Sequence, residues 1–246
     1  MRINSPKMNI IHKACMKASR SLIRDFGELE KLQVSSKGPS DFVTNSDKKV
    51  EKIIIEELTK TRKNFSIIGE EIGELKNSDK ENYWIIDPID GTTNFLHGIP
   101  HFAISIALRK KEEIISGLIF DPIKNEMFYA EKNNGAFFNN QRIRVSKKKN
   151  LNECLFATGG KDKTEYNLNI RKSGSAALDM AYVGTGRYDG YFQKNLNIWD
   201  IAAGIIIVKE AGGKINDLDC LSVNEIKVLA ASNIIYEKMV EKIYNF

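Results

Sequence analysis

The chain has 246 residues, and its 42% hydrophobic content is enough for one globular unit with a sizeable core. Its 37 Lys and Arg against 32 Asp and Glu give a formal net charge of +5, which is compatible with anionic substrates but too diffuse to demonstrate nucleic-acid binding. Three distant cysteines without a CxxC pair exclude a disulfide framework and a thiolate zinc site. The sequence has neither a signal-peptide core nor an apolar run of ~18 residues, so we expect a cytoplasmic protein.

Two helices are predicted before the first strand. Apolar residues at helical spacing predict a helix over 8–27 that ends at Gly27. After a polar segment, "SDKKVEKIIIEELTK" (46–60) predicts a second helix, with Asn45 or Ser46 as its N-cap. Short apolar strands are expected at 65–71 and 83–87, and each ends in carboxylates.

The pattern changes from residue 102 onward. Four consecutive β-rich runs between 102 and 146 predict an antiparallel meander. A helix over 173–186, a strand over 188–193 and a helix over 199–213 closed by glycines follow. Helices that flank mixed sheets indicate a layered α/β or α+β fold. The basic runs at 109–111 and 147–149 are expected in turns, as solvated surface.

Acidic residues stand where predicted strands end or helices begin. Carboxylates that meet at the rim of a sheet suit hard cations such as Mg²⁺. Two such ions about 3.5–4 Å apart can clamp the attacking and leaving oxygens of a phosphoryl displacement. A shared metal site is therefore predicted from these acids: Asp47, Glu70, Glu71, Asp87, Asp90 and Asp200.

Each acid also has a structural alternative. Asp200 could be an N-cap, and Asp47 could be a first-turn residue that offsets the helix dipole. Glu70 and Glu71 could be loop acids, and Pro88 favours a turn at "DPID". One shared site explains all of these positions more simply than several independent structural roles.

The residues after Asp90 point to a phosphate. Gly91 lets the backbone approach a ligand closely, and "TTNF" (92–95) could open a helix whose first amides bind phosphate oxygens. Thr92 can also hydrogen-bond a water and orient it. A phosphate bound there would touch both the metal ions and these amides.

Four motifs together resemble the signatures of the inositol monophosphatase family: "KGPSDFVTNSD" (37–47), "GEE" (69–71), "DPIDGTTNF" (87–95) and "WDIAAG…EAGG" (199–213). The resemblance covers nearly the whole chain. It implies an alternating α-β-α-β-α layered α+β fold in a single domain, 1–246. The half over about 1–145 would hold most metal ligands, and the half over about 146–246 the alcohol-side pocket and Asp200. It further implies two to three Mg²⁺ ions, lithium sensitivity and a homodimer.

Site roles follow from the resemblance residue by residue. Glu70, Asp87 and the Ile89 carbonyl resemble the ligands of one metal ion; Asp87, Asp90 and Asp200 resemble those of a second, and a weaker third ion would also use Glu70. Asp47 and Thr92 resemble the pair that positions and deprotonates the attacking water, with Glu70 beside them. Lys37 resembles a lysine near the acids, although a surface role is equally expected. The substrate would meet Glu70, Ile89, Asp90, Gly91, Thr92, Gly174, Ser175, Ala176, Gln193 and Asp200.

The implied activity is Mg²⁺-dependent hydrolysis of inositol 1-phosphate, but the sequence departs from the family at two places. Gln193 stands where inositol-directed members have a glutamate, which puts efficient use of inositol phosphate in doubt. The segment over 159–172 is short, and we expect a more open pocket with looser substrate choice. Histidinol phosphate, fructose 1,6-bisphosphate and nucleotide 3′-phosphates are alternative substrates. An RNA- or transcription-associated regulatory role is the alternative of another class, because some bacterial members of the family have one.

Overall fold

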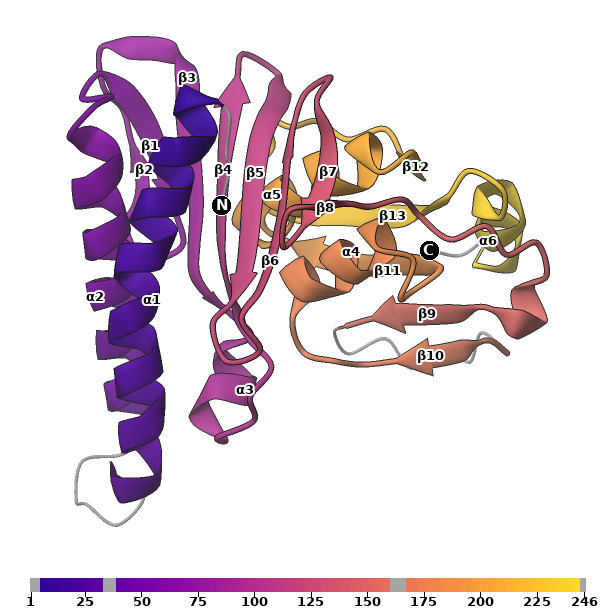
Figure 1. Ribbon diagram of the computed structural model, residues 1–246, viewed down its shortest axis with the longest axis horizontal. Helices are drawn as coiled ribbons and strands as arrows, with labels where there is room; N and C mark the ends of the chain where they lie inside the picture. The colour runs from indigo at the N-terminus through magenta and orange to yellow at the C-terminus, as the bar shows by residue number, and fades with distance from the viewer. Residues whose placement is uncertain (1–4, 33–38, 160–166, 244–246) are drawn as a thin grey trace.

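The computed structural model describes residues 5–32, 39–159 and 167–243, and it has five layers (Figure 1). Helices α1 (Pro6–Leu32) and α2 (Pro39–Thr59) cover one face of an eight-stranded sheet. Helices α4 (Ala176–Gly184) and α5 (Ile198–Glu210) lie between that sheet and a five-stranded sheet, which α6 (Tyr236–Lys242) covers on its outer side. The predicted α-β-α-β-α arrangement is confirmed. Among the described helices, none is long and apolar enough to span a bilayer.

The first helix extends beyond its predicted end. Gly27 was expected to stop α1, yet the helix continues to Leu32. Leu29, in the added turn, is only 1% exposed and packs into the core between the helices and the sheet. Burial of this side chain offsets the ~1 kcal/mol that a glycine costs inside a helix.

The second helix begins earlier than predicted. It starts at Pro39, so neither Asn45 nor Ser46 is its N-cap, and that prediction is wrong. A proline is well suited to the first helical position because its φ is preset and its missing N–H has no intrahelical partner there. Ser46 lies inside the helix, where its buried hydroxyl donates to Asp25 on α1 over 3.3 Å. Residues 39–47 of the polar segment therefore belong to α2.

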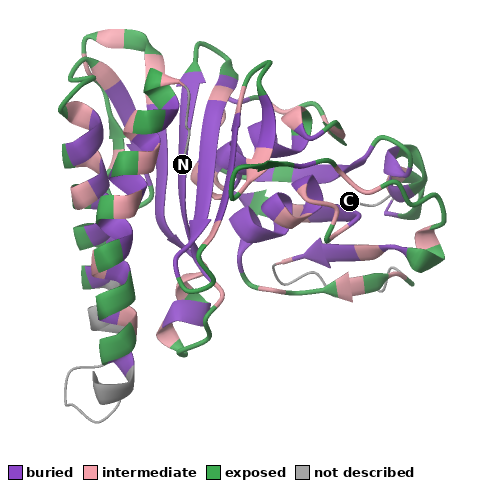
Figure 2. Cartoon of the chain, in the orientation of Figure 1, coloured by how far each residue is buried: buried purple, intermediate pink, exposed green. Residues whose placement is uncertain are grey.

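The eight-stranded sheet has the order β2-β1-β3-β4-β5-β6-β7-β8. Strands β1 and β3 are parallel, whereas the remaining neighbours are antiparallel, which confirms the predicted meander. Figure 2 shows the central strands buried over most of their length. The strands are β1 (Phe65–Gly69), β2 (Gly73–Leu75), β3 (Asp79–Asp90), β4 (Ala103–Lys110), β5 (Glu113–Asp121), β6 (Glu126–Glu131), β7 (Gly135–Phe138) and β8 (Gln141–Arg142).

Strand β3 runs through "DPID", so the turn weighed at Pro88 is not formed. Its pairing with β4 shifts register between Asp87 and Asp90, around Pro88. Pro88 has no N–H for the ladder, so an irregularity at this point is expected. The chain then leaves the sheet into the short helix α3 (Thr92–Leu96), as predicted.

The second half of the chain was predicted only in part. Helices α4 and α5 and strand β11 (Gly190–Leu196) are confirmed. The prediction missed α6, the short 3₁₀ helix Leu151–Glu153 and the other strands of the five-stranded sheet, whose order is β10-β9-β11-β13-β12. These strands are β9 (Leu155–Thr158), β10 (Asn169–Arg171), β12 (Gly213–Ile215) and β13 (Ile226–Ser232).

The expectation that both basic runs are solvated surface in turns is wrong for Arg109. It lies on β4 and is 5% exposed; its guanidinium stacks 4.3 Å from the ring centre of Tyr83 and donates to the Cys220 carbonyl over 2.8 Å. Its neighbours Lys110 and Lys111 are exposed, and in the second run Lys148 pairs with the buried Asp189 at 2.9 Å. In the first run, Arg109 is therefore part of the core, whereas Lys110 and Lys111 form an exposed cationic end of β4.

Replacing Gly117 by alanine should destabilise the protein by ~1–3 kcal/mol, because α5 lies directly against β5 at this glycine. A Cβ atom there would lie 2.7 Å from the Cα atom of Ala203, which is backbone and has little freedom to move. Gly27→Ala is the matched control: it is exposed in α1 with nothing within 4 Å, and should be neutral or up to ~1 kcal/mol stabilising. Urea denaturation measures both; equal effects would argue against this packing.

Candidate active site

Five of the predicted acids come from three elements and one turn that meet at one end of the eight-stranded sheet. Asp87 and Asp90 end β3, Glu70 follows the parallel strand β1, Asp200 lies in the first turn of α5, and Asp47 lies in α2. This is the end at which α3 leaves the sheet, at the bottom of Figure 1. Parallel strands place their carboxyl ends at the same edge, so β1 and β3 deliver their acids together.

The pKa values show that these acids interact. Burial raises the pKa of Asp87 well above its usual range, and repulsion from Glu70, Asp90, Asp200 and Asp47 adds to it. Asp87 is therefore close enough to all four of these carboxylates to feel their charge. The predicted convergence of these five acids is present in the fold.

The other members of the group are shifted in the same direction. Burial, followed by repulsion from Glu70, raises the pKa of Asp47 to about 8. Burial and then the charge of Asp200 raise the pKa of Glu70 to about 7, although the residue is exposed along part of its side chain. The pKa of Asp90 rises to about 7 and that of Asp200 to about 6, in both cases chiefly through burial. No Lys or Arg among the described residues is a main cause of any of these pKa shifts.

The loop after β3 is held by local hydrogen bonds. Asp87 Oδ1 accepts from the Ile89 amide over 3.0 Å, and the Ile89 carbonyl accepts from Thr92 Oγ1 over 3.0 Å. Gly91 has a φ of 99°, and a Cβ atom there would lie 3.1 Å from the His101 carbonyl and 3.3 Å from the Gly174 carbonyl. The site therefore needs glycine at 91 for two reasons, backbone conformation and space.

Asp90 connects the first half of the chain to the second. Its carboxylate accepts from the Ser175 hydroxyl and from the amides of Ala176 at 3.2 Å and Ala177 at 3.0 Å, all at the start of α4. Ser175 also caps α4 by accepting from the Leu178 amide. Two of the predicted alcohol-side residues thus lie beside the acids, with their polar groups bonded to Asp90.

Asp200 is not an N-cap and Asp47 is not a first-turn residue, although Asp200 does complete the capping box of α5. Asn197 is the N-cap of α5; Asp200 lies three residues further on, where its Oδ2 accepts from the Asn197 amide over 2.7 Å. Asp47 lies in the interior of α2 and not in its first turn. It is 4% exposed, and its Oδ1 atom is buried without any hydrogen-bond partner in the described structure.

Sequence reasoning missed two buried acids near the site. Glu51 follows Asp47 by one helical turn, is 3% exposed, and accepts from the Glu71 amide over 3.2 Å. The i, i+4 spacing of Asp47 and Glu51 could have revealed it. Asp179 on α4 is 1% exposed and accepts from the Ser173 hydroxyl over 2.7 Å, and its position gave no comparable signal.

The remaining predicted residues lie around this group. Gly174 has a φ of 85° and packs against the amide of Asn94, which donates to the carbonyls of His101 and Ser173. Gln193 Oε1 accepts from Tyr191 over 2.8 Å and lies so close to Gly159 that no Cβ atom would fit there. Lys37 and residues 160–166 of the short 159–172 segment lie outside the described residues.

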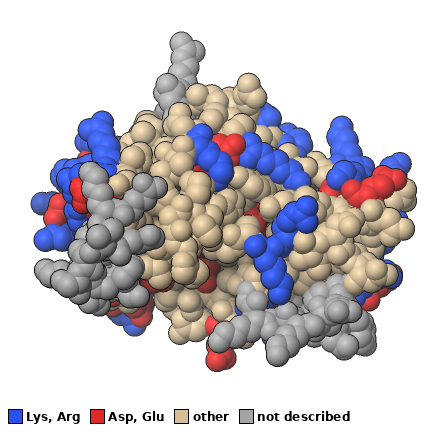
Figure 3. Space-filling model, turned by 90° about the horizontal axis from the view of Figure 1, so that it is seen from below, with Lys and Arg blue, Asp and Glu red and all other residues tan. Residues whose placement is uncertain are grey.

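The oxygen donors of the site fit Mg²⁺, although the acidic side chains do not surround one common position. Within the described ranges, no three Asp, Glu, His or Cys side chains stand at metal-ligand spacing. Carboxylate oxygens are nevertheless the donors that Mg²⁺ prefers, and the unpartnered buried Oδ1 of Asp47 lacks a positive partner. From below, Figure 3 shows small acidic areas within a mainly uncharged surface, with Lys and Arg side chains at its margins and across its middle.

The chain is similar to known proteins over nearly its whole length. A model of the inositol monophosphatase family matches residues 4–245. The chain is 46% identical over 230 residues to an inositol-1-monophosphatase of Rhizobium meliloti, covering 87% of this chain and 86% of the relative. It is 41% identical over 227 residues to the Nus factor SuhB of Escherichia coli K12, covering 86% and 85%. The crystal structure of the extragenic suppressor protein suhB from Bartonella henselae superposes with a TM-score of 0.86 at 45% identity, covering 97% and 98%.

The free energy of unfolding of the metal-free protein should fall as the pH rises from about 5 to 8. Asp47, Glu70 and Asp90 have folded-state pKa values of about 7 to 8, above the ~3.9–4.3 of an unfolded chain. The folded protein binds more protons in this window, so the stability they contribute is present below pH ~4 and lost as the pH passes through the folded pKa values.

Urea denaturation in EDTA at several pH values measures this dependence. Added Mg²⁺ should restore stability most at pH 8, because it replaces the lost protons as the counter-charge. A free energy of unfolding that rises between pH 5 and 8 in EDTA would show that the carboxylates do not repel one another in this way.

Proposed function

Because the chain belongs to the inositol monophosphatase family, we propose that it is a Mg²⁺-dependent hydrolase of phosphate monoesters of small polyols, with inositol 1-phosphate as the first candidate substrate. The observation that carries the proposal is the group of buried acids whose pKa values rise by burial and mutual repulsion. Such a group is costly without a cation, and cations are what a phosphate ester needs at its oxygens.

We assign the metal ligands to residues that present oxygen atoms at this end of the sheet. They are the carboxylates of Glu70, Asp87, Asp90 and Asp200 and the carbonyl of Ile89. Mg²⁺ held there would neutralise charge on the ester and acidify the attacking water. Asp90 would keep its orientation because three donors of α4 hold its carboxylate.

Asp47 is our candidate general base. Its Oδ1 atom has no hydrogen-bond partner among the described residues, so it is available to accept a proton from water. Thr92 donates to the Ile89 carbonyl, which leaves its oxygen lone pairs available to orient the water. The backbone amides of Gly91 and Thr92 would hold the phosphate, since no side chain at Gly91 blocks its approach.

Gln193 is our candidate for contact with the alcohol. Tyr191 donates to its Oε1, which fixes the amide, and its NH₂ group has no acceptor among the described residues and would meet a hydroxyl oxygen. A glutamate here would accept hydrogen bonds from sugar hydroxyls with a full charge, whereas glutamine does so more weakly. We therefore propose a substrate range broader than inositol 1-phosphate, with histidinol phosphate, fructose 1,6-bisphosphate and 3′-phosphonucleotides as the panel to assay. Homodimer formation and lithium inhibition stay predictions.

Replacing Asp47 by asparagine should lower kcat by about three orders of magnitude, within the range for loss of a general base. The same change removes one of the repelling charges, so the metal-free variant should be more stable than the parent at pH 8. Turnover of the substrate panel and urea denaturation in EDTA measure the two effects. Asp217→Asn, an exposed acid far from the group in sequence, is the control and should change neither. A variant with parental turnover would remove Asp47 from the mechanism.

Replacing Gln193 by glutamate should raise kcat/KM for inositol 1-phosphate about tenfold, because a charge-assisted hydrogen bond is ~1.5 kcal/mol stronger than a neutral one. Tyr191 can donate to the new carboxylate as it does to the amide. Hydrolysis of p-nitrophenyl phosphate, which has no hydroxyl groups on its leaving group, should stay within twofold and serves as the control. Equal gains on both substrates would show that position 193 does not contact the alcohol.

A regulatory role is the second candidate, because a relative of 41% identity is named a Nus factor. The two functions separate in a complementation experiment with Asp47→Asn. A role in transcription that does not use hydrolysis would be retained by this variant, whereas a metabolic role would be lost with turnover.

A further inference from the structure

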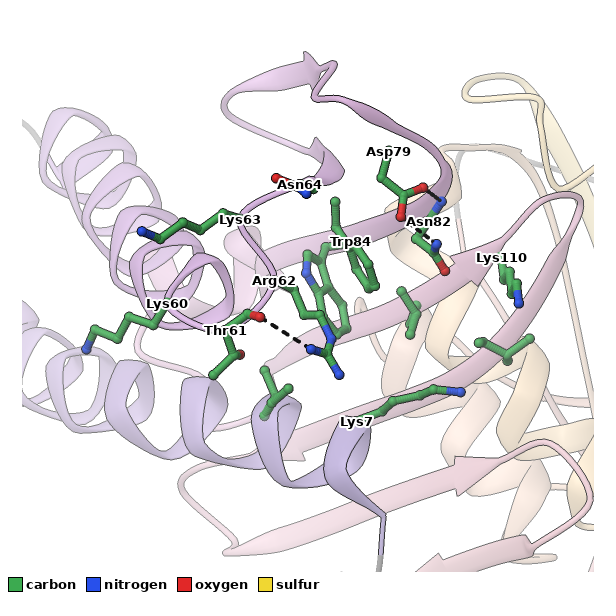
Figure 4. Close-up of a pocket in the computed structure, with 14 residues that line it drawn as sticks. Lys7, Lys60, Thr61, Arg62, Lys63, Asn64, Asp79, Asn82, Trp84 and Lys110 are labelled. Atoms are coloured by element: carbon green, nitrogen blue, oxygen red, sulfur yellow. Dashed lines mark hydrogen bonds between the residues drawn. The ribbon is translucent and has the colours of Figure 1, made fainter.

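A second pocket lies at the opposite end of the eight-stranded sheet from the acids. It has a volume of about 670 Å³ and lies where β1 begins at Phe65, where β3 begins at Asp79, and where β4 ends at Lys110 (Figure 4). Five residues of β1 separate Phe65 from Glu70, a span of roughly 16 Å. The pocket is therefore separate from the candidate active site.

Cationic side chains from three parts of the chain surround this pocket. Lys7 comes from the first turn of α1, Lys60, Arg62 and Lys63 from the connection between α2 and β1, and Lys110 from the end of β4. Figure 4 shows them on different sides of Trp84.

Most of these cations have no ionic partner in the described structure. Lys60 pairs with Glu57 at 2.6 Å, but Lys7, Arg62, Lys63 and Lys110 form no ion pair within 4 Å in the described ranges. Nearby like charges repel, and a multivalent anion would relieve that repulsion.

The one acid among the described lining residues has its own partners. Asp79 accepts from the backbone amides of Glu81 and Asn82, and its other oxygen accepts from the Asn82 side chain over 2.8 Å. These bonds occupy its carboxylate within the bend that starts β3. It offsets only part of the positive charge around the pocket.

The floor of the pocket supplies an independent indication of a ligand. Trp84 is 1% exposed, and its indole Nε1–H is buried without an acceptor in the described structure. A buried donor left unpaired costs roughly 1–3 kcal/mol, so an oxygen atom bound beside it would be favoured. Phe65 packs 5.7 Å from Trp84, and the guanidinium of Arg62 lies 5.9 Å from the Phe65 ring centre.

We propose that this pocket binds a small polyanion that carries at least two phosphate groups. The four unpaired cations match such a charge, and the Trp84 N–H matches a phosphate oxygen. The volume lies in the ~300–1,000 Å³ range of small-molecule sites. A small ligand fits better than a nucleic acid strand, because the cations border one concavity instead of following a groove, with the Lys60 and Lys63 side chains extending away from Trp84 (Figure 4). The site is additional to the proposed phosphatase site and does not depend on it.

Calorimetric titration of inorganic pyrophosphate into the full chain in EDTA tests the proposal. Without metal, the active-site acids repel the probe, so the expected saturable binding of one pyrophosphate per chain reports on this pocket. Arg62→Glu and Lys63→Glu should each weaken binding at least tenfold. Lys227→Glu, an exposed lysine on β13 in the other sheet, is the matched control and should stay within twofold.

Trp84→Phe tests the indole donor and should weaken pyrophosphate binding about threefold to tenfold. If this buried variant does not fold, the two charge reversals carry the test alone, because Arg62 and Lys63 are exposed. Hydrolysis of p-nitrophenyl phosphate with Mg²⁺ should be unchanged in Arg62→Glu, so failure of this proposal and failure of the phosphatase proposal are distinguishable.

Three outcomes would overturn the proposal. The first is no saturable binding of pyrophosphate, and the second is equal weakening by Lys227→Glu and Arg62→Glu. The third is binding of a 12-nucleotide single strand that Arg62→Glu abolishes while pyrophosphate does not bind, since the phosphates would then be those of a nucleic acid.

Discussion

The contact between Asp90 and the first turn of α4 is the interaction on which the site depends. It joins the last residue of β3 to a helix whose sequence position is some 85 residues later, through a hydroxyl and two amides. A buried carboxylate that accepts three hydrogen bonds is partly compensated for its lost hydration. The same contact holds the second half of the chain against the first, so the geometry of the acids and the packing of the two sheets are set together.

The other acids lack that degree of compensation, and the fold tolerates them through its large apolar layers. Asp47 has an unpartnered oxygen, and burial and repulsion raise the pKa values of Asp47, Glu70 and Asp87. Such a cluster destabilises the metal-free protein, and it also creates a strong negative electrostatic potential at this end of the sheet. Stability and activity are expected to oppose each other here, because the feature that costs free energy is also the one that would attract a cation.

The sequence predicted which acids the fold brings to one end of the sheet better than it predicted the boundaries of the elements around them. Strand ends are visible as apolar runs that stop at acids, so the order of residues alone was enough to place Asp87 and Asp90. The start of α2 could not be placed in this way, because the residues between Pro39 and Ser46 are mainly polar and carry no apolar repeat at helical spacing. Glu51 was missed because a charged residue in an amphipathic helix is ordinarily solvated, and only tertiary packing buries it.

Short strands and long cationic side chains escaped prediction for related reasons. The strands β10 and β12 have three residues each, too few for an alternating pattern to appear. Arg109 was expected to be solvated because it is charged and stands in a basic run. In the structure its guanidinium contacts the Tyr83 ring and the Cys220 carbonyl, which hold it in the core. In both cases the deciding partner lies far away in the sequence.

Strands β1 and β3 carry opposite charge at their two ends. Acids lie at the carboxyl ends of both strands, exposed at Glu70 after β1 and buried at the end of β3, whereas Lys7, Arg62, Lys63 and Lys110 lie near the strands' beginnings. The roughly 16 Å along β1 is about twice the Debye length of ~8 Å at physiological ionic strength, so charges exposed to solvent at one end are largely screened from the other. Any influence of an anion at the basic end on the acids would therefore have to pass through the packed strands themselves, by a shift of β1 against β3, and not through the electrostatic field.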